Sequence, residues 1–457
     1  MPEMIVIGVY FLAMLGIGAA SYRKARRADD FFVAGRKSTT PFITGSLLAT
    51  IVGGSATVGM AGLGYTQGLT GAWWLLAGSA GLLVLGLFFA GRVRRFALYT
   101  LPELIEKQYD RRVAIAASVL IVIAWVAVVA AQIIAAGQIA GILGAGSPTL
   151  WMVIFTAIFI AYTVLGGQYA ILRTDALQAI IILGGIFGGL ALVLSRLGGW
   201  DGLHNVLPPE QFAFPVGPNF GGADLASMLL VVGLTYVVGP DMYSRIFCAR
   251  DDRTARASAF GTAAIIVPVA LAVTLLGMGA AALFPDIAPE QALPMVIKEV
   301  FSPLLAGIVL AALLCAVMSS ADTTLLSAGT ILTVDIIGGF RQPADQTAVL
   351  PRSRLVIVLL GICALAVALL FRGIISSLLF AYTVYTAGVI LPVIAGFFRN
   401  RLRVTATGAL AALVGGGAAG IAAKLLEIEY LDLAALGLSA VLLFAVSFID
   451  NRLKNRA

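Results

Sequence analysis

Apolar runs of about 20 residues recur along the whole of this 457-residue chain, and each is long enough to cross the hydrocarbon core of a bilayer as a helix. Only 12% of the residues are charged, about half of what a soluble domain carries. We therefore expect an all-α polytopic membrane protein, held in the lipid bilayer as a single domain over residues 1–457. The sequence predicts thirteen transmembrane helices, near residues 3–22, 41–66, 71–91, 114–144, 149–165, 169–193, 224–248, 257–284, 302–334, 354–371, 374–398, 403–424 and 431–449.

The basic residues predict how these spans are oriented. The first apolar run lacks a basic start and a small-residue cleavage site, so it is not expected to be a secretory signal. A basic stretch at residues 23–27 follows it, which places the N-terminus outside and the C-terminus inside a cytoplasmic membrane. Only four of the 30 Lys and Arg then fall in outside segments, namely Arg196, Lys298, Arg372 and Lys424. The basic residues behind the net charge of +7 are thus explained by the membrane topology, and no nucleic-acid partner is expected.

Two of the spans carry helix-breaking residues in their interior. The second span contains Gly53-Gly54-Ser55 and the seventh contains Gly239-Pro240. Glycine weakens a helix, and proline removes one of its hydrogen bonds. A break at membrane depth is tolerated only where the freed backbone lines a cavity or is covered by protein. Both spans are therefore expected to be broken helices beside a cavity.

The two broken spans are five spans apart, so they open two five-span units of opposite orientation, over about 41–193 and 224–398. Broken helices at matching positions of inverted repeats point to a binding site near the midplane of the membrane. The helices at 3–22, 403–424 and 431–449 are expected to be peripheral to this five-plus-five core.

A polar stripe lies in the ninth span. Ser319, Thr323, Ser327 and Thr330 share one helical face, with Ser320 and Asp322 at its edges. An ionisable side chain inside a membrane span is costly and marks a functional site by default. The alternative is that the hydroxyls bond to carbonyls of their own helix or pack against a neighbouring helix.

Four segments, in order, resemble the sodium:solute symporter family, whose members have the five-plus-five inverted-repeat fold of the leucine-transporter type. They are Asp30–Arg36, Gly166–Gln178, Pro240–Arg256 and Met318–Asp335. The resemblance implies a sodium-coupled symporter that imports a small organic solute by alternating access, and not an enzyme. Two other classes remain open. One is a proton-coupled or uncoupled carrier of the same fold, and the other is a transporter-like membrane sensor.

The resemblance also implies a main sodium (Na+) site where the second span meets the ninth. Its ligands would be backbone carbonyls of Ala49, Val52 and Ala316 and the hydroxyls of Ser319 and Ser320. This donor set suits a hard monovalent cation, because neutral oxygens replace its hydration shell. Unwinding of the second span would free carbonyls that carry partial negative charge.

A second ion site would consist of Asp175 and Asp322 with Thr323, together with Ser319. Asp175 has an alternative interpretation, as a salt bridge to Arg173 or Arg245 near the cytoplasmic surface. Two close carboxylates could bind a cation, or one of them could hold a proton.

The substrate pocket is expected beside the two breaks. The positions where the sugar-transporting branch of the family holds its substrate carry Ala56, Leu75 and Val238, which argues against a sugar. Half-helix N-termini favour a carboxylate, and Asp241 could contact an amine or pair with Arg245 one turn away. A small amino acid or a monocarboxylate is therefore expected. The predicted pocket residues are Ser55, Ala56, Thr57, Trp74, Tyr236, Asp241, Tyr382 and Tyr385.

Overall fold

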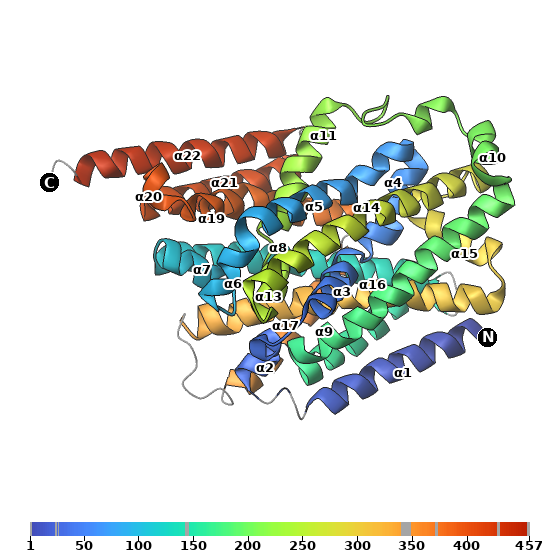
Figure 1. The fold of residues 1–457 in the computed structure, drawn as a ribbon, viewed down its shortest axis with the longest axis horizontal. Coiled ribbons are helices and arrows are strands. Elements are labelled where there is room, and N and C mark those ends of the chain that lie inside the picture. Colours follow the sequence, from blue (N-terminus) through green and yellow to red (C-terminus); the bar gives the residue numbers. More distant parts are fainter. Residues whose placement is uncertain are drawn as a thin grey trace.

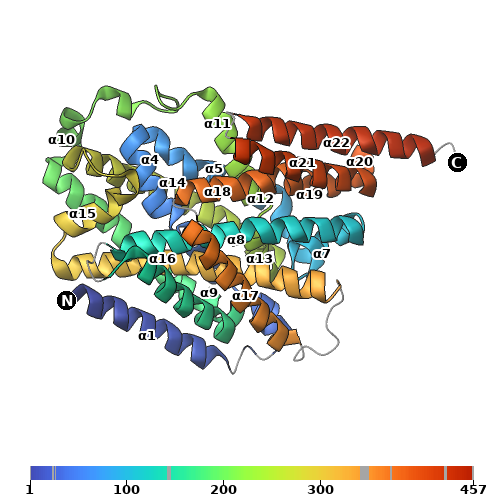
Figure 2. The ribbon, with the colours of Figure 1, turned by 180° about the vertical axis from the view of Figure 1, so that it is seen from behind.

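The computed structural model describes residues 2–22, 25, 27–141, 146–339, 349–370, 373–426 and 430–454, and every regular element within them is a helix. Most of the long helices run roughly along one common direction, with α1 along one edge and α21 and α22 along the opposite edge (Figures 1 and 2). Basic residues Arg23, Lys24, Arg26 and Arg372, which carry part of the topology prediction, lie outside the described residues.

The helices of the first half are α1 (Pro2–Tyr22), α2 (Ala28–Val33), η1 (Ala34–Arg36), α3 (Thr40–Ile51), η2 (Ser55–Gly59), α4 (Met60–Gln67), η3 (Gly68–Ala72), α5 (Trp73–Val84), η4 (Leu85–Phe89), α6 (Ala90–Phe96), α7 (Leu101–Gln108), α8 (Arg111–Gly141) and α9 (Pro148–Leu197). Those of the second half are α10 (Gly199–Val206), η5 (Pro209–Phe212), α11 (Gly222–Met228), η6 (Leu229–Gly233), α12 (Leu234–Val237), α13 (Pro240–Cys248), α14 (Asp252–Leu283), η7 (Pro289–Gln291), α15 (Ala292–Val300), α16 (Pro303–Thr330), η8 (Ile331–Ile337), α17 (Val349–Leu370), α18 (Ile374–Tyr385), η9 (Thr386–Ile390), α19 (Leu391–Gly396), α20 (Arg399–Leu402), α21 (Ala406–Leu426) and α22 (Leu431–Lys454).

Within the described ranges, ten helical segments are long and apolar enough to cross a membrane, and two shorter apolar helices cover 8–22 and 40–51. The predicted count of thirteen spans is therefore not established by helix length. Part of the difference lies in α9, whose backbone leaves helical geometry at Gly167 (φ 52°, ψ −158°). Tyr162 and Thr174 hydrogen-bond through their hydroxyls at 2.5 Å, although 12 residues of straight helix would separate them by about 18 Å. The chain thus reverses at Gly167, between the predicted fifth and sixth spans.

The helix α16 lies in the middle of the bundle, where it packs against α1, α3, α8 and α9. Every residue from Val309 to Ile331 is buried. The polar stripe of the ninth span therefore faces protein on all sides, and its side chains must find partners on neighbouring helices or on their own backbone.

Both predicted breaks are present. The helix α3 ends at Ile51, Val52 departs from helical geometry (φ −83°, ψ 57°), and the helix resumes at Ser55. The helix α12 ends at Val237, Val238 adopts φ −132° and ψ 40°, and α13 starts at Pro240.

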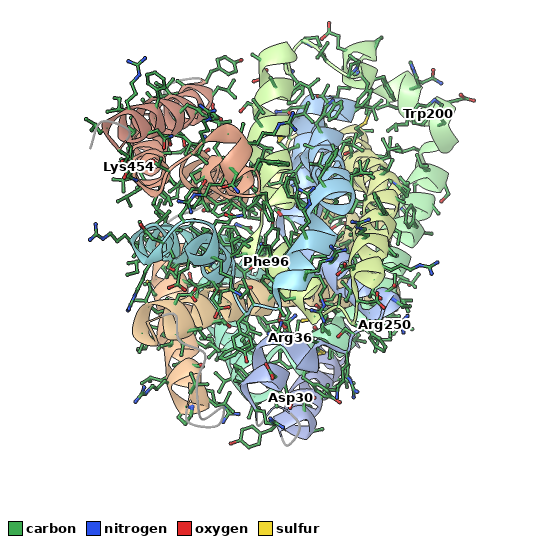
Figure 3. All side chains as sticks on the ribbon, turned by 60° about the vertical axis from the view of Figure 1, so that its left-hand side comes forward. Asp30, Arg36, Phe96, Trp200, Arg250 and Lys454 are labelled. Carbon is green, nitrogen blue, oxygen red and sulfur yellow. The ribbon has the colours of Figure 1, made fainter. Side chains whose placement is uncertain are left out.

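The segment before α3 is tied to the segment after α13. The Ser38 amide donates to the Cys248 carbonyl at 3.0 Å, and the Arg250 amide donates to the Ser38 carbonyl at 3.1 Å. Figure 3 labels Arg36 and Arg250 on these two segments. The two broken segments are therefore fastened to each other at one end of the bundle.

Candidate functional site

The first break brings α3 and α16 together through their polar atoms. The Ser319 hydroxyl donates to the Ala49 carbonyl at 2.7 Å, and the Ser320 hydroxyl donates to the Thr50 carbonyl at 2.5 Å. Both hydroxyls are also within 3.1 Å of the Ala316 carbonyl of their own helix. The last carbonyls of a helix have no partner within it, so the break after Ile51 leaves these α3 carbonyls free for α16.

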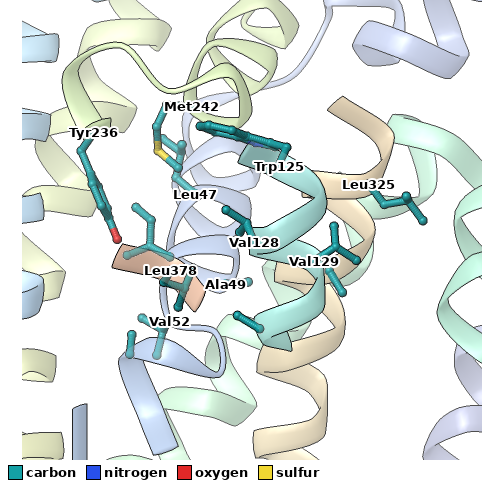
Figure 4. Close-up of a cluster of buried hydrophobic side chains, with 14 of the residues drawn as sticks. Leu47, Ala49, Val52, Trp125, Val128, Val129, Tyr236, Met242, Leu325 and Leu378 are labelled. Carbon is teal, nitrogen blue, oxygen red and sulfur yellow. The ribbon is translucent and has the colours of Figure 1, made fainter. Parts of the chain in front are cut away.

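This cluster of neutral oxygens fits a sodium ion, because carbonyl and hydroxyl oxygens from two helices converge on one buried spot. The structure brings together four of the five predicted ligands, namely Ala49, Ala316, Ser319 and Ser320. Val52 lies in the break just after α3 (Figure 4), but Ser320 bonds to the carbonyl of Thr50. Thr50 was not predicted as part of this oxygen cluster, although its position in the last turn of α3, where carbonyls lack helical partners, could have indicated it. The role of Val52 stays a prediction.

The first break needs glycine at positions 53 and 54, because a side chain at either position would collide with its neighbours. A Cβ atom on Gly53 would collide with Ser320 Oγ and would lie 3.0 Å from Gln132 Oε1. The amide N–H of Gly54, freed by the break, donates to Gln132 Oε1 at 2.9 Å. Gln132 lies on α8 and is buried. Sequence reasoning missed it, because a single Gln in an apolar helix is ordinarily a packing residue.

We expect Gly53→Ala to weaken sodium binding at least tenfold, because the new methyl group displaces Ser320 Oγ from the break. Titration of purified protein with radioactive sodium would measure this. Gly184→Ala is the matched control, since a Cβ there meets no atom of a neighbouring described residue within 4 Å. Equal sodium affinity in both variants would contradict the placement of Ser320 beside the break.

A buried polar cluster lies next to this site. Arg245 Nη2 is 3.4 Å from Asp175 Oδ2, and both side chains are 0% exposed. Ser46 Oγ also donates to Asp175 Oδ2, at 2.5 Å. The Arg245 guanidinium further donates to Ser46 Oγ at 3.1 Å, to Thr50 Oγ1 at 3.0 Å and to Thr323 Oγ1.

Two expectations about these charges need correction. The alternative salt bridge between Asp175 and Arg245 is present, but it is fully buried and not near the surface. The pair between Asp241 and Arg245 is not found in the described part of the chain, because the guanidinium points to α3, α9 and α16. Arg173 instead lies over the ring of Tyr169, with 4.3 Å between the guanidinium carbon and the ring centroid.

The predicted second ion site is brought together in part. Thr323 Oγ1 donates to Asp322 Oδ1 at 3.3 Å, and it accepts a hydrogen bond from Arg245, which also contacts Asp175. Among the described residues, Asp175 Oδ1 and Asp322 Oδ2 are buried and have no hydrogen-bond partner. Arg245 therefore lies among the three residues predicted for a second ion, and the role of those residues as ion ligands stays a prediction.

A narrow cavity lies between the two breaks. Four of the predicted substrate residues are in its wall, namely Ser55, Tyr236, Asp241 and Tyr382. The remaining wall residues were not predicted as substrate contacts and are Thr50, Ile51, Val128, Gln132, Thr235, Met242, Ser320 and Thr324. Figure 4 shows Tyr236, Val128 and Met242 around this region. The free volume is about 20 Å³, enough for little more than one water molecule, so a solute can enter only if the walls move apart.

The other four predicted substrate residues are outside the wall of this cavity. Ala56 is fully buried, and the Thr57 hydroxyl donates to the Gly53 carbonyl at 2.8 Å. The Tyr385 hydroxyl donates to the Val238 carbonyl at the second break. Trp74 stacks on Tyr382, with 6.2 Å between ring centroids. Their contact with substrate stays a prediction.

Trp74 also lines a second and larger cavity, of about 290 Å³. Tyr382 lines the narrow cavity and Trp74 the large one. The stacked pair therefore connects the wall of the narrow cavity to the wall of the large one.

Two broken helices, with an oxygen cluster where the first of them crosses α16, are typical of secondary transporters built from inverted repeats. The family model for the sodium:solute symporter family matches residues 31–416. The chain therefore belongs to the sodium:solute symporter family.

Relatives of this chain include the osmoregulated proline transporter OpuE of Bacillus subtilis, 26% identical over 80% of this chain and 77% of that protein. The sodium/proline symporter of Haemophilus influenzae is also 26% identical, over 80% and 77%. Sodium/glucose cotransporter 4 of mouse is 26% identical over 94% of this chain and 69% of that protein.

Solved structures share the fold. A Na+-coupled sialic acid symporter, solved in a substrate-bound outward-open state, superposes with a TM-score of 0.82 at 16% identity and 98% coverage of both chains. The nucleobase-cation-symport-1 family transporter Mhp1 gives a TM-score of 0.62 at 15% identity, over 92% of this chain and 93% of that one. At these identities the likeness concerns the fold alone.

Proposed function

We propose that this chain imports a small amino acid together with sodium by alternating access. The observation that carries the proposal is the pair of hydrogen bonds by which Ser319 and Ser320 reach the carbonyls of Ala49 and Thr50 at the first break. A sodium ion bound there takes the carbonyl and hydroxyl oxygens as ligands and joins α3 to α16.

Coupling follows because the ion and the solute share residues. Thr50 and Ser320 belong to the proposed sodium site and also line the narrow cavity. A ligand shifts a conformational equilibrium only by its differential affinity for the two states. Since the same α3 segment contacts both ligands, the state that favours one also favours the other, and the coupling is reciprocal.

The direction of transport is inferred from what closes each end of the narrow cavity. On one side the stacked Trp74–Tyr382 pair lies against both the narrow cavity and the 290 Å³ cavity. On the other side lie the Arg245 cluster and the backbone bonds that tie Ser38 to Cys248 and Arg250. In the predicted topology, the end of the bundle where Ser38 is bonded to Cys248 and Arg250 is the cytoplasmic one. This conformation is then closed to the cytoplasm, and ions leave past Asp175 when that end opens.

An amino acid is better supported than a monocarboxylate. Asp241 is the one charged side chain in the described wall of the narrow cavity. It also lies in the first turn of α13, where its own carboxylate already benefits from the helix N-terminus. An anion bound at this break would face Asp241, whereas the amine of an amino acid would pair with it. Two relatives are named for proline, which agrees with this choice.

A sugar is less well supported, even though another relative is named for glucose. Ala56, Leu75 and Val238, at the positions matched to the sugar contacts, are all fully buried. None of them is in the wall of the narrow cavity.

A thermal-shift screen of amino acids, monocarboxylates and sugars tests the substrate proposal, because a ligand that binds the folded state raises its apparent stability. We expect an amino acid to raise the melting temperature in sodium chloride and to have no effect in choline chloride. Stabilisation by a monocarboxylate alone, or equal stabilisation in the two salts, would contradict the proposal.

We expect Asp241→Asn to weaken binding of the amino acid found by this screen by about tenfold or more, because hydrogen bonds to charged groups contribute about 1.5–3 kcal/mol. Isothermal titration in sodium chloride measures the change. Asp201→Asn, at an exposed position of α10, is the matched control. Unchanged affinity in Asp241→Asn would mean that the amine does not bind at the second break.

A further inference from the structure

We propose that a cavity between α6, α7 and α20 binds the headgroup of an anionic phospholipid. This cavity shares no described wall residue with the narrow cavity at the two breaks. Its occupant therefore does not depend on which solute the chain transports.

The cavity is large and basic. Its free volume is about 680 Å³, which is within the range of ligand pockets. Four basic residues lie in its wall, namely Arg92 and Arg95 of α6, Lys107 of α7 and Arg399 of α20. No described residue of the wall carries a carboxylate. Cations gathered in one cavity repel one another, so this basic cavity favours an anion.

Two of the four cations are available to a ligand. Arg95 already has a salt-bridge partner on α14. Arg92 and Lys107 are exposed and have no salt-bridge partner within the described residues. The guanidinium carbon of Arg92 lies 5.5 Å from the ring centroid of Phe398, and Lys107 Nζ lies 6.0 Å from that of Phe96. The aromatic rings thus hold both cations at the cavity while their N–H groups stay free for a phosphate.

The basic cavity lies where membrane spans end. Two candidate spans, Ser55–Phe96 and Ile374–Gly396, end in its wall, and Figure 3 labels Phe96 at the first of these ends. The helices α7 and α20 lie toward the end of the bundle at which α22 ends (Figures 1 and 2). All four cations belong to segments that the topology predicts to be cytoplasmic. Basic pockets between membrane helices on this side bind the headgroups of anionic lipids.

An exposed apolar stripe leads along the first span to the basic cavity. Val84 and Phe88 are 38% and 56% exposed, and Arg92 follows at the same spacing of four residues. Residues four apart lie on one face of a helix, so the stripe ends at Arg92. The cavity wall also contains three phenylalanine rings. An acyl chain along this stripe would place its phosphate beside Arg92, whereas a soluble anion would gain nothing from the apolar surface.

A bound lipid would connect helices at this end of the bundle. Its phosphate would join α6 to α7 through Arg92 and Lys107. The helix α6 is in turn bonded to the segment before α14, because Arg94 Nη2 donates to the Arg250 carbonyl at 3.4 Å. The Arg250 amide donates to the Ser38 carbonyl. The lipid is therefore expected to stabilise the end of the bundle where the two broken segments are fastened to each other.

Thermal unfolding of the purified full-length chain in a neutral detergent tests the proposal, because a ligand that binds the folded state raises its melting temperature. Phosphatidylglycerol, phosphatidylcholine with the same acyl chains, and potassium phosphate would be titrated separately at constant ionic strength. We expect phosphatidylglycerol to raise the melting temperature, and the other two to have no effect at the same concentrations. Arg92→Gln/Lys107→Gln is expected to raise the phosphatidylglycerol concentration for half-maximal stabilisation about tenfold or more.

Arg112→Gln/Arg401→Gln is the matched control, because it removes two exposed basic residues outside the cavity wall, and it is expected to respond as the wild type does. An equal loss in this control would mean general charge attraction and would overturn the site. Equal stabilisation of the wild type by the two lipids, or by phosphate alone, would overturn the choice of ligand. Should the double variant fail to fold, Arg92→Gln and Lys107→Gln decide singly. Each is expected to weaken the response several-fold, and a wild-type response in both would contradict the proposal.

Discussion

Asp175→Ala is expected to lower the free energy of unfolding by about 3–5 kcal/mol, because it leaves the buried guanidinium of Arg245 without its counter-charge. Both side chains of this pair are 0% exposed, and Asp175 also accepts a hydrogen bond from Ser46 at 2.5 Å. Denaturant titration in detergent micelles, followed by tryptophan fluorescence, measures the loss.

The matched control for Asp175 is Asp252→Ala, because Asp252 pairs with Arg95 at the surface, where the side chains are 32% and 70% exposed. Removal of a surface pair is expected to cost less than about 1 kcal/mol. Similar stabilities for the two variants would mean that the pair between Asp175 and Arg245 does not hold α9 and α13 together.

The double variant Ser319→Ala/Ser320→Ala is expected to raise the sodium concentration for half-saturation by a hundredfold or so, or to abolish binding. Each hydroxyl interaction with a charged group contributes about 1.5–3 kcal/mol, and each factor of ten in affinity is about 1.4 kcal/mol. Ser320→Ala alone is expected to raise it about tenfold. Radioactive sodium binding to the purified protein measures both changes.

Thr330→Ala is the control for these hydroxyls. Thr330 lies on the same helix, but its hydroxyl bonds to the Leu326 carbonyl of its own helix at 2.7 Å. Sodium binding in this variant is expected to equal that of the wild type. If Ser320→Ala binds sodium as tightly as Thr330→Ala, Ser320 is not a ligand.

The main outlines of the fold could be predicted from the sequence, because they depend on local chemistry. Gly53-Gly54-Ser55 and Gly239-Pro240 break their helices where the pattern predicted. The reversal at Gly167 matches the predicted boundary between the fifth and sixth spans, since a positive φ is readily adopted by glycine. The hydroxyls of Ser319 and Ser320 contact α3, and their predicted role as sodium ligands stays a prediction.

The residues that were missed depend on contacts between distant parts of the chain. Arg245 resembles an ordinary basic residue near a cytoplasmic helix end, and its nearest acid in the sequence is Asp241. Its partner Asp175 is 70 residues away and could be predicted only as one alternative, near the surface; the full burial of the pair becomes evident only once α9 and α13 pack against α3. Gln132 was missed for a similar reason, because the Gly54 amide that it caps becomes free only when the second span breaks.

The central claim is that sodium bound between α3 and α16 drives uptake of the solute, and transport by the purified chain in proteoliposomes tests it most directly. A radiolabelled amino acid from the thermal-shift screen would be supplied outside, with either an inward sodium gradient or a proton gradient alone. We expect accumulation above equilibrium only with the sodium gradient, and none in the Ser319→Ala/Ser320→Ala variant. Equal accumulation with the proton gradient alone, or in the absence of sodium, would contradict the account.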